Sequence, residues 1–386
     1  MGKNEGKNFY FTDLKQLEFA RAHIHEKKFQ EALKLLTVEA EQYLKIPIQA
    51  VTDKILMPLS NDKHDYVSLA KYRWPNPDTK DGLPYIRRDG EVNPEVEKYD
   101  VKIFTDFSQA VQALSFAYFY TGKEKFALRA IEWLNTWFIN PDTRMNPHFE
   151  YAQFIPGEEH KGHGIIEGNR LRRLPDSIAL LGFHISNEEM SSIRAWFGQM
   201  ARWLTTSEKG VYVANMQNNQ AVWQAEQVAL YSDFSTDSTG EIKEIFERAR
   251  KLIDDRIDND GSMPNELMRT RSLHYHFFTL LAFIDLATMA KMHGIDLFNY
   301  KSPKNAGIRT TLEFLIPYIT KLEIWSHEQI TPIHWPLVVE ILRRSAYAYQ
   351  EARYEEITNE IPKSIMKDVV SAVEWIDLIL PPYSKN

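Results

Sequence analysis

The chain has 386 residues, of which 44% are hydrophobic and 12% aromatic, enough to bury a large core. Its length is beyond the point at which a single compact core usually stops growing. It therefore forms either two domains or one elongated helical array. The 46 basic and 53 acidic side chains give a net charge of −7, so nucleic-acid binding is not expected and a polyanionic ligand would need a locally basic cleft. The absence of cysteine excludes disulfides, zinc–thiolate sites and thiol nucleophiles.

Apolar side chains recur at spacings of three and four along most of the chain, which predicts an all-α protein. The expected helices are 12–25, 27–45, 47–57, 101–121, 123–138, 169–184, 187–206, 214–231, 239–258, 265–293, 305–319, 332–353 and 364–379. Ser186 before Asn187 is typical of a helix start, and Gly294 of a helix end. Because short loops join most of these helices, we expect antiparallel helical hairpins arranged in a ring or arc.

Two long segments, 58–100 and 140–168, interrupt the helical pattern. Both are too rich in aromatic residues for disorder, so we expect them to form the walls of a site. The longest nearly apolar run, 277–290, is short and contains Asp285, so membrane insertion is not expected. The first residues have no apolar stretch typical of an export signal.

The stretch "ANMQNNQAVW", residues 214–223, places five side-chain amides at the start of an expected helix. Gln217, Gln220, Gln224 and Gln227 then form a stripe away from the alanine face. This stripe is either a solvated face or a set of amides that bind a carboxylate or sugar hydroxyls, since each amide both donates and accepts hydrogen bonds.

In the stretch "MPNELMRTRSLHYHFF", residues 263–278, Arg271 and Tyr275 fall on one helix face, opposite the apolar stripe. A surface Arg lying over a Tyr ring is the simpler interpretation. A cation beside a phenol also lowers the cost of forming a phenolate, which would suit a catalytic pair.

Four blocks together resemble the alginate lyase superfamily of polysaccharide lyases. They are "KYRWPNPDTKDGLPYIRRDGEVNPE" (71–95), "HFEYAQFIPGEEHKGHGIIEGNRL" (148–171), "NMQNNQAVW" (215–223) and "MPNELMRTRSLHYHFF" (263–278). The resemblance covers about residues 50–290. It implies one domain over residues 1–386, an incomplete (α/α) toroid of about six to seven helical hairpins, with a concave cleft formed partly by 58–100 and 140–168.

The resemblance also implies β-elimination on a uronic-acid polymer, with alginate as the first candidate, without a cofactor. In this chemistry donors neutralise the substrate carboxylate, a base removes H5 and an acid protonates O4. Transferred to this chain, Asn219 and Arg269 neutralise the carboxylate and Tyr275 acts as base and acid. Arg271 is the alternative to Arg269, and it becomes the better candidate if 265–275 is regular helix.

The sequence departs from the family motif at one position, where Asn-Asn-His is replaced by Asn218-Asn219-Gln220. A glutamine cannot accept a proton near neutral pH. The chain is therefore expected to bind its polymer but turn it over poorly. Either it is a natural branch that relies on Tyr275 alone, or Gln220 is an engineered inactivating replacement, which the Met-Gly start favours.

The remaining candidate site residues are expected to bind the sugar chain, because Arg pairs with carboxylates and aromatic faces stack on sugar rings. They are Asn218, Arg271, His274, Arg73, Trp74, Tyr85, Arg87, Arg88, His163 and Arg172. His160 and His163 have a metal-like spacing without a third ligand, so no metal is expected. The expected partner is an anionic polysaccharide, and the protein is expected to be a monomer that is periplasmic or secreted.

Three alternatives remain open. One is a glucuronan lyase. A second is a glycoside hydrolase on the same toroid, for which Glu158, Glu167, Asp81 and Asp89 are the available carboxylates. The third is a non-catalytic polysaccharide-binding protein, for which Gln220 is the best indication.

Overall fold

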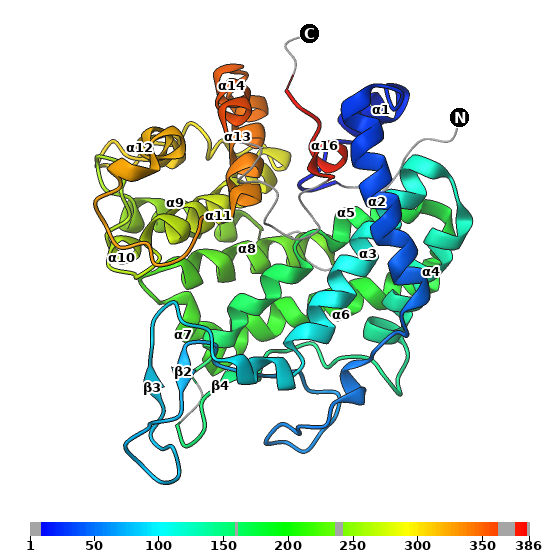
Figure 1. Cartoon of the computed structure of the whole chain (residues 1–386), viewed down its shortest axis with the longest axis vertical. Helices are drawn as coiled ribbons and strands as arrows, with labels where there is room; N and C mark the ends of the chain where they lie inside the picture. The colour runs from blue at the N-terminus through cyan, green and yellow to red at the C-terminus, as the bar shows by residue number, and fades with distance from the viewer. Residues whose placement is uncertain (1–8, 159–160, 236–241, 362–374, 384–386) are drawn as a thin grey trace.

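The protein is an arc of α-helices in two layers, with a few short strands at one edge (Figure 1). The computed structural model describes residues 9–158, 161–235, 242–361 and 375–383. The helices are α1 Leu14–Ala22, α2 Lys27–Lys45, α3 Val101–Thr121, α4 Glu124–Leu134, α5 Leu174–Leu181, α6 Asn187–Thr206, α7 Glu208–Ala214, α8 Asn219–Phe234, α9 Ile242–Arg256, α10 Pro264–Leu267, α11 Ser272–Met292, α12 Ile308–Thr320, α13 Trp335–Tyr349, α14 Arg353–Glu360 and α16 Ile376–Ile379.

The inner layer consists of helices that other helices cover on most sides. Helix α3 packs against α5, while α8 and α13 both pack against α11. Outer helices cover them: α2 and α4 lie on α3, α6 and α9 on α8, α12 on α11, and α14 on α13. One hydrophobic cluster extends from Tyr10 to Leu380. The predicted all-α toroid is confirmed. That the whole chain forms a single domain stays a prediction.

Helix α11 is the one described helix that is long and apolar enough to cross a membrane by length and composition alone. Its most apolar stretch is 83% buried inside the protein, as is usual for a core helix. Asp285, in the middle of this helix, is fully buried and pairs with arginines of neighbouring segments.

Capping residues explain several helix ends. The hydroxyl of Ser186 accepts a hydrogen bond from the backbone N–H of Glu189, whose carboxylate accepts one from the N–H of Ser186. Gly294, with φ +74°, follows the last turn of α11. The predicted start at Asn187 and the predicted end before Gly294 are both confirmed.

Other predicted helices differ from the structure. Only a single 3₁₀ turn, Val51–Asp53, forms within 47–57, because Pro47 leaves Ile46 extended and Ile55 is 92% exposed, with nothing to pack against. The predicted helix 169–184 is a 3₁₀ helix, His163–Leu171, followed by α5. Helices α7 and α14 were not predicted. Much of the predicted helix 364–379 lies outside the described residues.

Two short ladders connect the irregular segments. Strands β1 (Val67–Leu69) and β4 (Tyr151–Phe154) pair in parallel, which joins segment 58–100 to segment 140–168. Strands β2 (Arg73–Trp74) and β3 (Ile86–Arg87) pair antiparallel and form a hairpin near α7 (Figure 1). Both ladders lie at the edge of the helical layers and place polar side chains around one cleft.

Candidate active site

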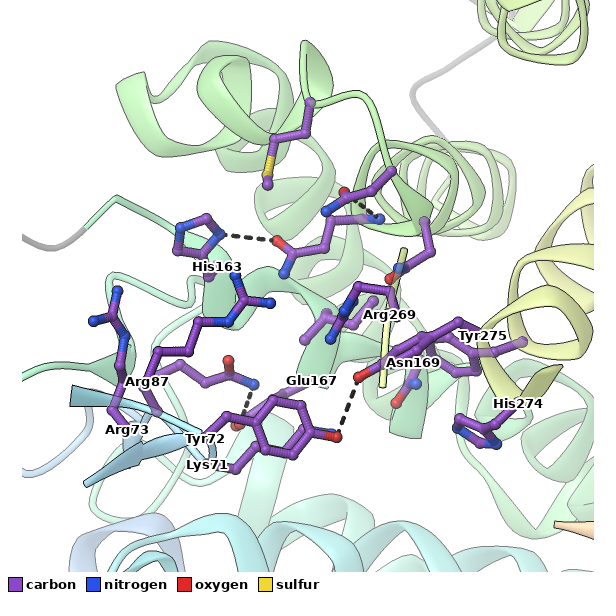
Figure 2. Close-up of a pocket in the computed structure, with 18 of the residues that line it drawn as sticks. Lys71, Tyr72, Arg73, Arg87, His163, Glu167, Asn169, Arg269, His274 and Tyr275 are labelled. Atoms are coloured by element: carbon purple, nitrogen blue, oxygen red, sulfur yellow. Dashed lines mark hydrogen bonds between the residues drawn. The ribbon is translucent and has the colours of Figure 1, made fainter. Parts of the chain in front are cut away.

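A cleft with a cavity volume of about 370 Å³ opens between the irregular segments and the first turns of α8 and α11 (Figure 2). This lies within the roughly 300–1,000 Å³ of small-molecule pockets. Its described lining contains five basic side chains and one carboxylate: Lys71, Arg73, Arg87, Arg170, Arg269 and Glu167. The cleft therefore supplies the local positive charge that the acidic chain lacks overall.

The amide of Asn219 is held in place by a buried carboxylate. Asn219 is the first residue of α8 and is 3% exposed. Its backbone N–H and its side-chain Nδ2 donate to the two carboxylate oxygens of Glu266, at 2.6 and 2.9 Å. Because Glu266 comes from the short helix α10, it fixes the amide of Asn219 at the wall of the cleft.

The phenol of Tyr275 lies beside a guanidinium and a second phenol. The guanidinium of Arg269 is 3.9 Å from the centre of the Tyr275 ring. The hydroxyl of Tyr275 donates to the hydroxyl oxygen of Tyr72 at 3.1 Å, and that oxygen also accepts from Arg271 at 3.1 Å (Figure 2). Tyr72, from segment 58–100, thus meets Tyr275 across the cleft.

The two phenols differ in acidity. Burial raises the pKa of Tyr275, although Arg269 opposes the shift. Burial would also raise the pKa of Tyr72, but Lys71, the hydrogen bond from Tyr275 and Arg271 together lower it. Tyr72 therefore ionises more readily than Tyr275, and its oxygen accepts the hydrogen bond that Tyr275 donates, with the proton held on Tyr275, the more basic of the two.

Arg269 lies in the non-helical turn between α10 and α11, residues 268–271, so the predicted helix 265–293 is broken there. The sequence favours Arg269 over Arg271 as the carboxylate-binding residue only if residues 265–275 are not a regular helix, and this turn meets that condition. Arg269 lines the cleft, whereas Arg271 lies behind Tyr72 as its hydrogen-bond donor.

Asp89 attaches segment 58–100 to this turn. Its carboxylate accepts two hydrogen bonds from Arg269, at 2.8 and 3.0 Å, and one from the backbone N–H of Thr270. These donors hold the pKa of Asp89 well below its usual range against the effect of burial. The next residue, Gly90, has φ +82°, and a Cβ at this position would lie 2.7 Å from the hydroxyl oxygen of Thr270, so glycine allows the close contact between the two segments.

Replacing Asp89 by Asn should lower the free energy of unfolding by about 2 kcal/mol, since hydrogen bonds to charged groups contribute roughly 1.5–3 kcal/mol each and only some are lost. Chemical denaturation and limited proteolysis of segment 58–100 would measure this. Asp81→Asn, on the exposed part of the same segment, is the matched control and should change neither the free energy of unfolding nor the rate of proteolysis. Equal stability of the Asp89 and Asp81 variants would contradict the proposed attachment.

Gln220 lines the cleft and contacts an imidazole from another element. Its Oε1 lies 3.3 Å from Nδ1 of His163, the first residue of the 3₁₀ helix (Figure 2). Asn218 caps α8, because its side chain accepts a hydrogen bond from the N–H of Gln220. Asn218 and His163 therefore lie beside Gln220 in the same wall.

Two of the four glutamines of the stripe do not face solvent. Gln224 and Gln227 are buried and donate to the carbonyls of Leu204 and Ile165, so they join α8 to its neighbours. Only the amides at the start of α8, at positions 218–220, line the cleft. The interpretation of the stripe as a solvated face is therefore wrong for Gln224 and Gln227, whereas Gln217 is exposed.

Some of the other predicted sugar-binding residues line the cleft and some lie outside its described lining. Arg73, Arg87 and His274 line the cleft, and burial lowers the pKa of His274 to about 3, so its ring is neutral. Trp74 lies under the guanidinium of Arg88 at 4.8 Å, on the hairpin outside the described cleft lining. Tyr85, half-buried on that hairpin, is also outside the lining.

The assignment of Arg172 to the sugar chain is wrong. Arg172 is buried and bonds to Asp285 of α11 and, at 2.5 Å, to Glu340 of α13. Arg344 also bonds to Asp285. Arg172 thus joins inner helices, since a buried guanidinium requires paired carboxylates, and the arginine that lines the cleft is Arg170.

No group of three or more potential metal-ligating side chains occurs among the described residues. His160 of the considered His160–His163 pair lies outside the described residues.

Comparison with known proteins identifies the family. The sequence profile described as Alginate lyase matches residues 50–325, well over half of the chain. The chain belongs to the alginate lyase family. The alginate lyase of Pseudomonas aeruginosa strain LESB58 is 25% identical over 215 residues, which cover 53% of this chain and 55% of that protein. The chain thus spans about half the length of the curated relatives it matches.

Solved alginate lyase structures share the fold. A crystal structure of an alginate lyase from Bacteroides ovatus aligns with a TM-score of 0.88 and 31% identity, over 97% of this chain and 99% of that one. Alginate lyase A1-III in complex with a tetrasaccharide aligns with a TM-score of 0.58 and 17% identity, over the whole of both chains. At 17% identity, the similarity to alginate lyase A1-III shows a shared fold and nothing more.

Sequence reasoning missed several alginate lyase-family cleft residues. Tyr72 and Lys71 lie inside the first resemblance block, but nothing in their spacing singles them out. Glu266, three residues before Arg269, could have been noticed as a carboxylate at a helix start. Its contact with Asn219 depends on packing between α10 and α8, which the sequence does not show.

Proposed function

We propose that this protein is a polysaccharide lyase that cleaves a uronic-acid polymer, alginate first, by β-elimination. The observation that carries the proposal is the convergence of the Asn219 amide, the Arg269 guanidinium and the Tyr275 phenol on one basic cleft. The alginate lyase A1-III complex with a tetrasaccharide, which shares the fold, supports an oligosaccharide ligand in this cleft. The panel of ligands to test includes glucuronan.

The proposed reaction begins at the substrate carboxylate. The amide of Asn219 and the guanidinium of Arg269 donate to it and stabilise the negative charge that develops when H5 is lost. The phenolate of Tyr275 takes H5, the electron pair forms the C4–C5 double bond, and the C4–O4 bond breaks. O4 then takes the proton from Tyr275, which leaves an unsaturated sugar and a new chain end.

Tyr72 has a place in the same scheme. Tyr275 must lose its own proton before it can accept H5, and it already donates to the oxygen of Tyr72. Lys71 and Arg271 favour the ionised form of Tyr72, so this phenol loses its proton to solvent first. Its phenolate oxygen can then take the proton of Tyr275 along the hydrogen bond, against the higher basicity of Tyr275. The phenol pair then provides a base at Tyr275 without a histidine at position 220.

The hydrolase alternative is less well supported. Inverting and retaining hydrolases need two carboxyl groups on either side of the scissile bond. Glu167, the one carboxylate of the described lining, already accepts hydrogen bonds from Tyr66, Ser68 and Gln153. Asp89 is engaged by Arg269.

The direct test is the ultraviolet absorbance of a digest. A lyase produces an unsaturated uronate that absorbs, whereas a hydrolase or a pure binder does not. Polymannuronate, polyguluronate, mixed alginate and glucuronan should each be incubated with the protein. No absorbing product from any of them would overturn the proposal. Export and a monomeric state stay predictions, to be tested by fractionation and light scattering.

The impaired-enzyme hypothesis makes a separate prediction at position 220. Gln220→His would restore a proton-carrying side chain to the motif, so the rate of product formation should rise, by roughly the 10²–10⁴-fold that a positioned acid or base contributes. The gain should be largest where H5 and O4 lie on opposite faces of the sugar ring. Equal rates for the two proteins would remove this hypothesis.

A further inference from the structure

The cleft contains an imidazole that the family motif does not supply. Position 220 holds an amide, yet Nδ1 of His163 lies 3.3 Å from Oε1 of Gln220. Both residues line the cleft. In Figure 2 His163 and Tyr275 lie at opposite sides of the drawn site.

The chain is built to hold this ring in place. Gly162 precedes it with φ +87°, and a Cβ there would lie 2.7 Å from Cβ of Lys209, so only glycine lets the loop approach α7 so closely. The ring of Tyr212, on α7, lies edge-on to His163 with centres 5.9 Å apart. His163 is thus positioned by two helices, α7 and α8.

The contact with Gln220 selects one tautomer. With the amide oxygen of Gln220 turned to His163, as here, Nδ1 is the donor in the tautomer that forms this hydrogen bond, and Nε2 then keeps its lone pair. Burial lowers the pKa of His163, the hydrogen bond with Gln220 opposes this shift, and the charges of Arg73, Lys161 and Arg87 act in the same direction as burial. The imidazole is therefore neutral near pH 7 and can accept a proton.

Resting on the proposed lyase function, we propose that His163 is the second proton-transfer group of the cleft and that Gln220 orients it. This group serves linkages that Tyr275 cannot serve alone. In mannuronate H5 and O4 lie on the same face of the ring, so one group can act on both. In guluronate, the C5 epimer, they lie on opposite faces, and two groups are needed.

At a guluronate linkage the two groups act from opposite faces of the sugar ring. Nε2 of His163 takes H5, the electron pair forms the C4–C5 double bond, and the C4–O4 bond breaks. In this step Tyr275 acts in its protonated form, which burial favours, and gives its proton to O4, whereas on mannuronate it first has to be deprotonated. Solvent then removes the proton from the imidazolium and returns one to the phenolate.

The experiment compares initial rates of absorbance increase on polyguluronate and polymannuronate for the unchanged chain and for His163→Gln. We expect the polyguluronate rate to fall about a hundredfold or more, as for loss of a general base, and the polymannuronate rate to stay within about threefold. His184→Gln, whose imidazole bonds to Tyr118 outside the described lining, is the matched control and should change neither rate.

A second variant, Gln220→Ala, separates orientation from folding. It leaves His163 in place but removes its partner, so the polyguluronate rate should fall by less than in His163→Gln, while polymannuronate cleavage continues. The unchanged chain should also lose polyguluronate activity as acid pH protonates His163. The His163→Gln variant should lack that loss.

The outcomes distinguish the two proposals. If the unchanged chain cleaves polymannuronate but not polyguluronate, or if His163→Gln affects both polymers equally or neither, the role of His163 is overturned while the lyase function stands. If the unchanged chain yields no absorbing product from any uronan, the lyase function itself fails, and the role of His163 fails with it.

Discussion

Replacing Tyr275 by Phe should reduce the rate of elimination on every uronan by about a thousandfold, within the 10²–10⁴ range of a lost acid–base group. The change removes only the hydroxyl, so the ring remains buried beneath Arg269. Binding should persist, because the basic lining of the cleft is unchanged. Absorbance assays give the rate, and calorimetry with an oligouronate gives the affinity.

Tyr72→Phe is the matched control for Tyr275→Phe. It removes the other hydroxyl of the hydrogen-bonded pair. If Tyr72 only holds the proton of Tyr275, this variant should lose less activity and regain part of it at alkaline pH, where Tyr275 ionises without help. A Tyr275→Phe variant that retains normal activity would exclude Tyr275 as base and acid.

Replacing Asn219 by Ala should lower kcat by about 10²–10³, the loss typical of one donor to a developing negative charge. The substitution also removes one of the hydrogen bonds that Glu266 accepts, which should reduce the free energy of unfolding by about 1–3 kcal/mol. Steady-state kinetics and chemical denaturation measure the two effects separately. An unchanged kcat would show that Asn219 has only a structural role.

Glu266→Gln provides the comparison for Asn219→Ala. The new amide keeps one acceptor oxygen but faces the other donor of Asn219 with an N–H group. The Asn219 amide remains in the cleft but loses its fixed orientation. We therefore expect a smaller loss of kcat than in Asn219→Ala, and a similar loss would mean that Asn219 works only when Glu266 fixes its orientation.

Helix boundaries were predictable wherever local chemistry determines them. Helix α2 spans Lys27–Lys45 as predicted, and Ser186 and Gly294 mark real helix ends. Helix α7 was missed because it has seven residues and contains Gly210, a poor helix former. That glycine is required for packing, since a Cβ would lie 2.2 Å from the carbonyl oxygen of Leu204.

The candidate site was predictable only in part, because side-chain roles depend on long-range packing. Asn219, Arg269 and Tyr275 were found through the resemblance, and the structure brings all three to one cleft. Arg170 and Arg172 stand two residues apart, yet one lines the cleft and the other is buried between helices. Nothing in "NRLRR" distinguishes them before the 3₁₀ helix at 163–171 is known.

The attachment of segment 58–100 through Asp89 has a consequence for the order in which the protein loses its properties on heating. Asp89 and Arg269 are 180 residues apart, and Tyr72 and Tyr275 are 203 apart, whereas most helices pack against near neighbours in the chain. Tyr66, Val67 and Leu69 anchor the start of the segment in the core, whereas residues 71–92, with the hairpin of β2 and β3, are attached largely by hydrogen bonds such as these. This part can therefore detach while the helical layers remain folded. Enzymatic activity would then disappear at a lower temperature than the helical circular dichroism signal, and amide hydrogen exchange would be faster in residues 71–92 than in α8 or α11.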